Sequence, residues 1–174
     1  MKFSRATEAE IDAATNIVDQ CRDELTKRGI LQWDAQYPNR EFFQKATAEN
    51  TLFILTSAGV VYGVVVLDEC QAQEWENVEW QQTGGNSLVV HSLAVLPSAH
   101  GQGVGTAMLG YCEAFAHDAG YTSMRLDAFS GNAAALRFYE RHGYLFQGEI
   151  DLTFKPVGHQ KYFCYEKLLV QPAV

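Results

Sequence analysis

The stretch VLPSAHGQGVGTAML, residues 95–109, places three glycines at alternate positions between an apolar run and a helical one. A strand that leads into a glycine loop and then a helix brings backbone N–H groups and the positive end of the helix dipole to one point. An anion such as a phosphate is stabilised there, and side chains at Gly101, Gly103 and Gly105 would obstruct its approach. The stretch therefore predicts a phosphate-binding turn between a strand and a helix.

Other interpretations of this turn fit less well. A P-loop needs a Lys directly after its last glycine, and none follows here. A dinucleotide-binding fingerprint would carry a third glycine at position 106, which is Thr106, and would turn directly after the strand, whereas PSAH intervenes. In its favour, Asp127 ends the next strand, where that motif has a ribose-binding acid. A plain strand-to-helix loop needs one glycine at most.

Composition limits the class of protein. A chain of 174 residues, 47% hydrophobic and 20% charged, is long enough for one buried core, so we expect a single domain over residues 1–174. The net charge of −8, without a run of Lys or Arg, argues against nucleic-acid binding and permits a cationic substrate. The sequence has no apolar window of about 20 residues and no apolar N-terminal segment, which predicts a cytoplasmic protein without membrane contact. The four scattered cysteines predict reduced thiols and no metal site.

Periodicity and capping residues predict a mixed α/β order. Helices are expected from the Thr7-x-x-Glu10 capping box to Gly29, from about residue 38 to 49, from about 103 to 117, and from 133 to 142. Strands are expected at residues 2–6, 51–56, 60–67, 87–96, 123–129, 145–150 and 162–169. Residues 68–86 show no clear pattern, and a long loop or an edge strand is the interpretation for them. Antiparallel hairpins come first, and one parallel βαβ unit follows in the second half.

LAVLPSAHGQGVGTAML resembles the pyrophosphate-binding loop of the GNAT superfamily of acyl-CoA-dependent N-acetyltransferases. His100 stands where that family usually has Arg or Gln. Downstream, RLDAFSGNAAALRFYERHGY resembles the second half of the family's cofactor site. The two motifs cover residues 87–149. The resemblance implies a mostly antiparallel mixed sheet of six or seven strands with about four helices, and acetyl-CoA as cofactor.

The resemblance also implies cofactor-binding residues. The backbone of Leu93, Ala94 and Val95 would accompany the pantetheine arm, and His100, Gly101, Gln102, Gly103, Val104, Gly105 and Thr106 would surround the pyrophosphate. Asn132, Ala135 and Tyr139 share one helix face, with Asn132 and Tyr139 about 10 Å apart along it, which suits the same arm. Tyr139 matches the family's general acid for the departing thiolate. Asn132 is equally a good helix N-cap, and a half-buried aromatic is the alternative for Tyr139.

An amine acceptor arrives mostly as an ammonium, so a base is needed before it can attack. His91, two residues before Leu93 on the same face of the predicted strand, is the candidate, and the arylalkylamine branch of the family is similar in carrying His at this offset. A core histidine is the alternative, with Glu69 and Glu79 as reserve bases.

The connection LQWDAQYP follows the first predicted helix, where the GNAT resemblance places the border of the acceptor pocket. Trp33, Asp34 and Tyr37 are the substrate-binding candidates there, although Trp33 could instead hold two helices together. The sequence predicts an enzyme that moves acetyl from acetyl-CoA to a primary amine of a small molecule or peptide, by direct attack in a ternary complex. The alternative is an inactive acyl-CoA sensor or interaction module on the same fold. The oligomeric state is open, and a homodimer is one expectation.

Overall fold

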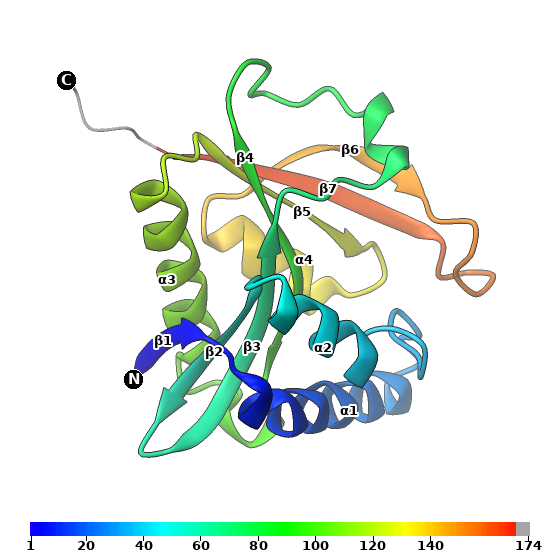
Figure 1. Cartoon of the computed structure of the whole chain (residues 1–174). Coiled ribbons are helices and arrows are strands. Elements are labelled where there is room, and N and C mark those ends of the chain that lie inside the picture. The colour runs from blue at the N-terminus through cyan, green and yellow to red at the C-terminus, as the bar shows by residue number, and fades with distance from the viewer. Residues whose placement is uncertain (170–174) are drawn as a thin grey trace. The chain divides into compact units, whose positions relative to one another are not determined.

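The computed structural model describes residues 1–169 (Figure 1). The chain forms two compact units, one of residues 1–68 with 90–112 and the other of residues 69–89 with 113 onward. Strand β4 (Ser87–Val95) and helix α3 (Val104–Asp118) each contribute residues to both units. The expectation of a single domain stays a prediction.

The first unit begins with β1 (Lys2–Arg5) and a short 3₁₀ turn, η1 (Glu8–Glu10), that leads into α1 (Ile11–Lys27). The predicted capping box is present, because the backbone N–H of Thr7 donates to the Glu10 carboxylate over 2.7 Å. Gly29 follows α1 with a φ of 73°, in the left-handed region that ends helices. Helix α2 (Arg40–Ala48) has Asn39 as its N-cap, with the side chain accepting the Phe42 N–H. Strands β2 (Leu52–Ser57) and β3 (Val60–Asp68) then form the predicted hairpin.

The core of this unit lies between α1, α2 and the strands. Helix α1 packs against α2 and β3. The buried residues repeat at helical spacing on α1 and at alternate positions on the strands, which is what one apolar face of each element requires. They are Ala6, Ile11, Ala14, Ile17, Val18, Cys21, Phe43, Ala46, Leu52, Ile54, Val64, Val66 and Ala94.

The second unit holds β5 (Ser123–Phe129), α4 (Ala133–Arg141), β6 (Leu145–Asp151) and β7 (Lys161–Leu168). Its strands are hydrogen-bonded in the order β4-β5-β7-β6, and those of the first unit in the order β1-β2-β3-β4. The pair β4–β5 is parallel, whereas β1–β2, β2–β3, β5–β7 and β6–β7 are antiparallel. Seven strands in a mostly antiparallel mixed sheet with four α-helices confirm the predicted fold class.

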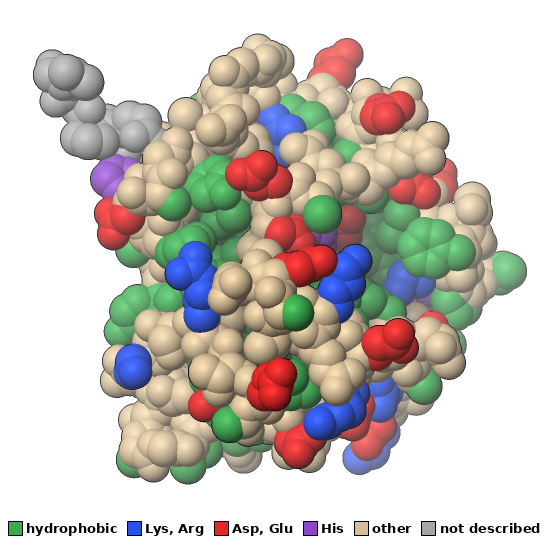
Figure 2. Space-filling view, in the orientation of Figure 1, with side chains coloured by type: hydrophobic (Ala, Val, Ile, Leu, Met, Phe, Trp, Pro, Cys, Tyr) green, Lys and Arg blue, Asp and Glu red, His purple; other side chains and the backbone are tan. Residues whose placement is uncertain are grey.

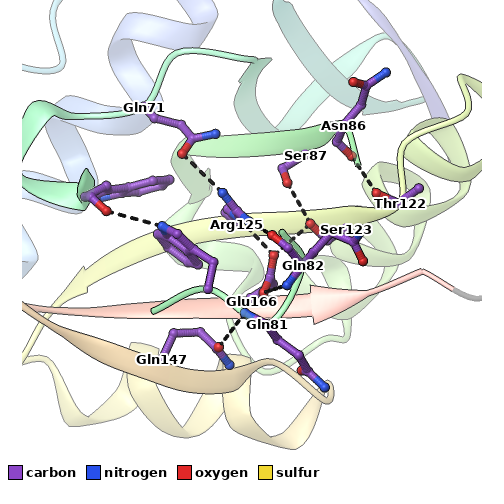
Figure 3. A network of polar contacts seen from close by, with 12 residues as sticks. Gln71, Gln81, Gln82, Asn86, Ser87, Thr122, Ser123, Arg125, Gln147 and Glu166 are labelled. Atoms are coloured by element: carbon purple, nitrogen blue, oxygen red, sulfur yellow. Dashed lines mark hydrogen bonds and ion pairs between the residues drawn. The ribbon is translucent and has the colours of Figure 1, made fainter. Parts of the chain in front are cut away.

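Residues 69–86, which sequence patterns leave unassigned, contain one 3₁₀ turn, η2 (Gln73–Asn77), and no strand. The Arg125 side chain of β5 holds this segment within the second unit (Figure 3). Its guanidinium pairs with the Glu166 carboxylate at 2.8 Å and donates to the Gln82 carbonyl at 2.6 Å and to the Gln71 side chain at 3.3 Å. The Trp80 ring lies 4.3 Å from the guanidinium carbon. Side-chain contacts, with the Arg125–Glu166 pair among them, thus hold this irregular segment where no strand ladder is present.

Among the residues that the structure describes, no helix is both long and apolar enough to span a membrane. Over the same residues, no group of three or more His, Cys, Asp or Glu side chains could hold a metal ion. On the face drawn in Figure 2, the Lys and Arg side chains lie apart from one another or beside Asp and Glu.

Candidate active site

The glycine turn joins η3 (Pro97–Ala99) to α3, as the sequence predicts. Gly101 and Gly103 have φ angles of 76° and 78°, which residues with a Cβ rarely adopt. A Cβ built at either position meets nothing within 4 Å. Glycine is therefore needed for the path of the backbone, and the space beside it is open for a ligand. This fits a pyrophosphate, which needs backbone donors without side chains in front of them.

Backbone donors are available where this turn becomes a helix. The first N–H groups of an α-helix have no intrahelical acceptor. In α3 the helical hydrogen bonds begin with the Ala107 N–H, which donates to the Gly103 carbonyl over 2.9 Å. The positive end of the helix dipole lies at the same place. The Gln102 N–H is directed to the Ala99 carbonyl at 3.3 Å. The Gln102 N–H is thus engaged within the turn, unlike the N–H groups that begin α3.

The His100 side chain is directed back to the end of β4. Its Nε2 atom lies 2.8 Å from the Val95 carbonyl oxygen and donates to it, and its Nδ1 atom lies 4.0 Å from the Glu24 carboxylate. The Cys21 thiol donates to the same carbonyl over 3.2 Å, and burial raises the pKa of this thiol to about 12. Two donors thus fix the Val95 carbonyl. The His100 imidazole, at the position where the GNAT resemblance has Arg or Gln, therefore makes a hydrogen bond inside the turn.

The middle of β4 departs from regular strand geometry. The registered pairs with β5 are confined to Ser87–Val89, whereas β4 itself continues to Val95. Ser92 has a φ of 50°, the left-handed region, at a cost of about 1–2 kcal/mol for a residue with a Cβ. The alternation of side chains between the two faces of a strand is therefore interrupted at Ser92. It no longer implies that His91 and Leu93 share one face. Ser92 donates a hydrogen bond of 2.9 Å to the Tyr37 hydroxyl, which ties the first connection to this irregular part of the strand.

The imidazole of His91 lies against a carboxylate that sequence reasoning missed. Its Nε2 atom is 2.9 Å from Oδ1 of Asp68, the last residue of β3. About a quarter of each side chain is exposed, 26% for His91 and 22% for Asp68. Of the reserve bases, Glu69 accepts a hydrogen bond from the Tyr121 hydroxyl at 2.8 Å, and Glu79 is exposed. His91 is thus not a fully buried core histidine, because it is part-exposed and hydrogen-bonded to a carboxylate.

The three candidates in the first connection have different surroundings. Trp33 packs against the core of the first unit. The Asp34 carboxylate accepts the backbone N–H groups of Gln36 at 2.7 Å and Tyr37 at 3.0 Å, so it shapes its own loop. Tyr37 stacks edge-on against Phe42, with ring centroids 4.8 Å apart. Tyr37 is the one of the three that the structure brings next to β4.

The second unit carries the remaining candidates on α4. Asn132 is the N-cap, 7% exposed, and its side-chain oxygen accepts the Ala135 N–H at 3.2 Å. Tyr139 is half-buried, and its ring lies edge-on to those of Phe138 at 5.3 Å and Tyr144 at 5.8 Å. Asn132 thus caps α4, and the ring of Tyr139 is held by its contacts with two neighbouring aromatic rings.

The comparisons with known proteins agree with this arrangement. The model of the Acetyltransferase (GNAT) family matches residues 18–144. The uncharacterized N-acetyltransferase YesJ of Bacillus subtilis is 27% identical over 142 residues, which cover 80% of this chain and 78% of that protein. A GNAT-family acetyltransferase of Streptococcus agalactiae superposes with a TM-score of 0.84 at 18% identity, covering 98% and 96% of the two chains. The ribosomal-protein-S18-alanine N-acetyltransferase of Escherichia coli gives 0.70 at 16% identity, covering 99% and 96%.

A glycine turn at the start of a helix, set on a seven-stranded mixed sheet, is the framework of a GNAT acetyltransferase. The chain belongs to the acetyltransferase (GNAT) family, and it is an enzyme of the transferase class.

Proposed function

We propose that the chain transfers the acetyl group of acetyl-CoA to a primary amine of a small molecule or peptide, by direct attack in a ternary complex. The observation that carries this proposal is the turn at Gly101 and Gly103, which has a left-handed backbone and open space beside both glycines, directly before α3. These donors suit a pyrophosphate even in a chain of net charge −8, because the binding charge is local to the helix end.

The residues that would hold the cofactor follow from this turn. The N–H groups from Gly103 to Thr106 would bind the pyrophosphate, and the backbone of Leu93, Ala94 and Val95 would bind the pantetheine arm. Asn132 and Ala135 on α4 would bind further along it. The His100 side chain is not required, because it is directed to the Val95 carbonyl.

The chemistry needs two proton transfers by this chain's side chains. Acetyl-CoA, when bound, supplies an acetyl group activated as a thioester. His91 would take a proton from the acceptor ammonium, which frees the nitrogen lone pair for attack on the acetyl carbon. Tyr139 would donate its phenolic proton to the departing sulfur, and the second proton that the nitrogen loses as the amide forms would pass through solvent to the Tyr139 phenolate. Tyr37, and with it Trp33 and Asp34, would border the acceptor.

The test measures release of the CoA thiol from acetyl-CoA in the presence of a panel of primary amines. The panel includes peptides with N-terminal alanine, because the Escherichia coli neighbour is named for a ribosomal-protein alanine. Release that depends on the amine is the expected result. Acetyl-CoA binding without release for any amine would instead support the inactive sensor.

A matched pair of glycine variants tests the cofactor site by isothermal titration. Gly105 and Gly110 both lie in α3, and a Cβ at Gly110 meets nothing within 4 Å. Gly105→Val should abolish acetyl-CoA binding by placing a branched side chain at the donors, whereas Gly110→Val should retain it. Equal affinity of the two variants for acetyl-CoA would show that the turn is not part of the cofactor site.

A further inference from the structure

His91 and Asp68 are joined by a hydrogen bond between the end of β3 and the irregular part of β4. Asp68 is the last residue of β3, and His91 directly precedes Ser92, whose left-handed backbone is tied to Tyr37. The distance from Nε2 to Oδ1 is 2.9 Å, within the range of a charge-assisted hydrogen bond. The backbones of two strands therefore hold an imidazole and a carboxylate at fixed separation.

The pairing determines which ring nitrogen can act as a base. An ionised carboxylate has no proton to donate, so Nε2 of His91 must carry the hydrogen that the Asp68 oxygen accepts. A neutral imidazole carries one N–H, and its second nitrogen then presents a lone pair. Nδ1 of His91 is that nitrogen.

The surroundings suit a group that takes up and releases a proton. Both side chains are about three-quarters buried, so their attraction is stronger than in bulk water, yet each keeps some exposure. Among the described residues, Asp68 is the acidic residue whose side chain contacts the His91 imidazole. The neighbouring Glu69 accepts a hydrogen bond from Tyr121, and the Tyr37 phenol is engaged by Ser92.

We infer that Asp68 is a positioning residue, which holds His91 in the Nε2–H tautomer so that Nδ1 accepts the proton of the acceptor ammonium. This inference rests on the proposed function. The N–H bond of the ammonium breaks and an Nδ1–H bond forms, which leaves a neutral amine and an imidazolium. The Asp68 carboxylate stabilises the imidazolium through Nε2 and stays ionised.

Two measurements on Asp68→Ala test the inference, because this variant leaves no oxygen to accept the Nε2–H, whereas an asparagine amide oxygen still could. The first is the tautomer of His91 in the protein without ligands, read from ¹⁵N–¹H long-range NMR correlations and assigned by the loss of the signal in His91→Gln. The second is the pair kcat and KM for the amine. We expect the Nε2–H tautomer in the native protein and its loss in Asp68→Ala. We also expect kcat to fall on the order of 10- to 100-fold, with KM nearly unchanged.

Asp151→Ala is the matched control. Asp151 is also the last residue of a strand, β6, and its side chain is exposed beside Lys161. It should change neither the tautomer nor kcat, and Asp68→Glu should recover part of the rate by restoring the carboxylate.

An unchanged His91 tautomer in Asp68→Ala would overturn the inference, because another contact would then fix the ring. A changed tautomer with an unchanged kcat would also overturn it, and would leave the proposed acetyl transfer intact with another base. Absence of amine-dependent CoA release in the native protein would overturn the proposed function, and the inference with it, whatever the NMR shows.

Discussion

The hydroxyl of Ser92 donates a hydrogen bond of 2.9 Å to the phenolic oxygen of Tyr37. Ser92 is the residue of β4 with a left-handed backbone, and Tyr37 belongs to the connection between α1 and α2. A strained residue persists when its surroundings hold it in place, and the phenol is one such constraint. The contact joins the proposed acceptor border to the strand that carries His91.

Tyr37→Phe should therefore raise the KM for the amine several-fold and leave the affinity for acetyl-CoA unchanged. The variant keeps the ring that packs on Phe42 and removes the oxygen that fixes it to β4. The free energy of unfolding should fall by about 1 kcal/mol, the usual net worth of one hydrogen bond. Steady-state kinetics with the amine as varied substrate, alongside acetyl-CoA titration, measures both effects. A loss of acetyl-CoA affinity would place Tyr37 at the cofactor rather than the acceptor.

Trp33→Ala should act mainly on stability. The indole packs against the core of the first unit, so its removal leaves a cavity beside Phe42 and the core residues, at a cost of about 2–4 kcal/mol. Urea denaturation measures this loss, and kinetics on the folded variant gives KM. Asp34→Ala serves as comparison, because it removes the acceptor of two loop N–H groups without touching the core. A raised amine KM in Trp33→Ala with native stability would show that the indole acts on acceptor binding and not on the packing of the core.

The buried pair of Arg125 and Glu166 predicts a strong non-additivity. These side chains are 7% and 1% exposed, and the pair also holds residues 71 and 82 (Figure 3). Arg125→Met should destabilise the protein by roughly 3–5 kcal/mol, because it leaves the Glu166 charge buried without its partner. Adding Glu166→Leu should recover much of that loss. Urea denaturation of the single and double variants completes the cycle, and equal, additive losses would show that the two charges act independently.

The four thiols should react at different rates. Cys70 is exposed, whereas Cys21, Cys112 and Cys164 are buried, and burial raises the pKa of the Cys21 and Cys164 thiols to about 12. One equivalent should react rapidly with Ellman's reagent at pH 8, and three only on unfolding. Cys70→Ser is the control that should remove the rapid phase. A second rapid equivalent in that variant would show that a buried thiol is accessible.

The same burial makes stability fall in alkali. The folded thiols keep their protons to about pH 12, whereas unfolded thiols lose theirs near 9.0. The native state therefore binds more protons between these values, and its stability declines as pH rises through that window. Urea midpoints from pH 8 to 10 measure the decline, and Cys21→Ala should reduce its slope. A slope unchanged by that substitution would assign the decline to other groups.

The sequence predicts those parts of the molecule that depend on local signals. The strand predicted at residues 123–129 coincides with β5, because an apolar run bounded by a turn fits few structures other than a strand. The glycines at 101 and 103 indicate the turn directly, since both have left-handed backbones. Asp68 was missed because its partner lies 23 positions away, across a segment without periodicity. That segment is held by Arg125, a long-range contact with no local pattern. The left-handed Ser92 has no signal either, since serine does not mark that backbone region.

Tyr139→Phe is the sharpest test of the proposed chemistry, because a phenol can protonate a thiolate and a phenyl ring of nearly the same shape cannot. The variant keeps the edge-on packing with Phe138 and Tyr144. If Tyr139 is the general acid, kcat should fall by roughly 10²- to 10⁴-fold, about 3–5 kcal/mol of barrier. The lower end is expected, since a thiol with a reference pKa near 8.5 is already a fair leaving group and water can replace the acid. Affinity for acetyl-CoA should barely change.

Tyr144→Phe is the control for that experiment. It removes the neighbouring phenol, whose hydroxyl contacts Met124 sulfur at 3.6 Å, and keeps the ring against which Tyr139 packs. Its kcat should stay near that of the native protein, because this hydroxyl is buried and directed to a core side chain. A burst of product before the steady state would reveal that release of product limits kcat, and the two variants are then compared in single turnovers. Native single-turnover rates in Tyr139→Phe would exclude the phenol as the proton donor and leave solvent to protonate the thiolate.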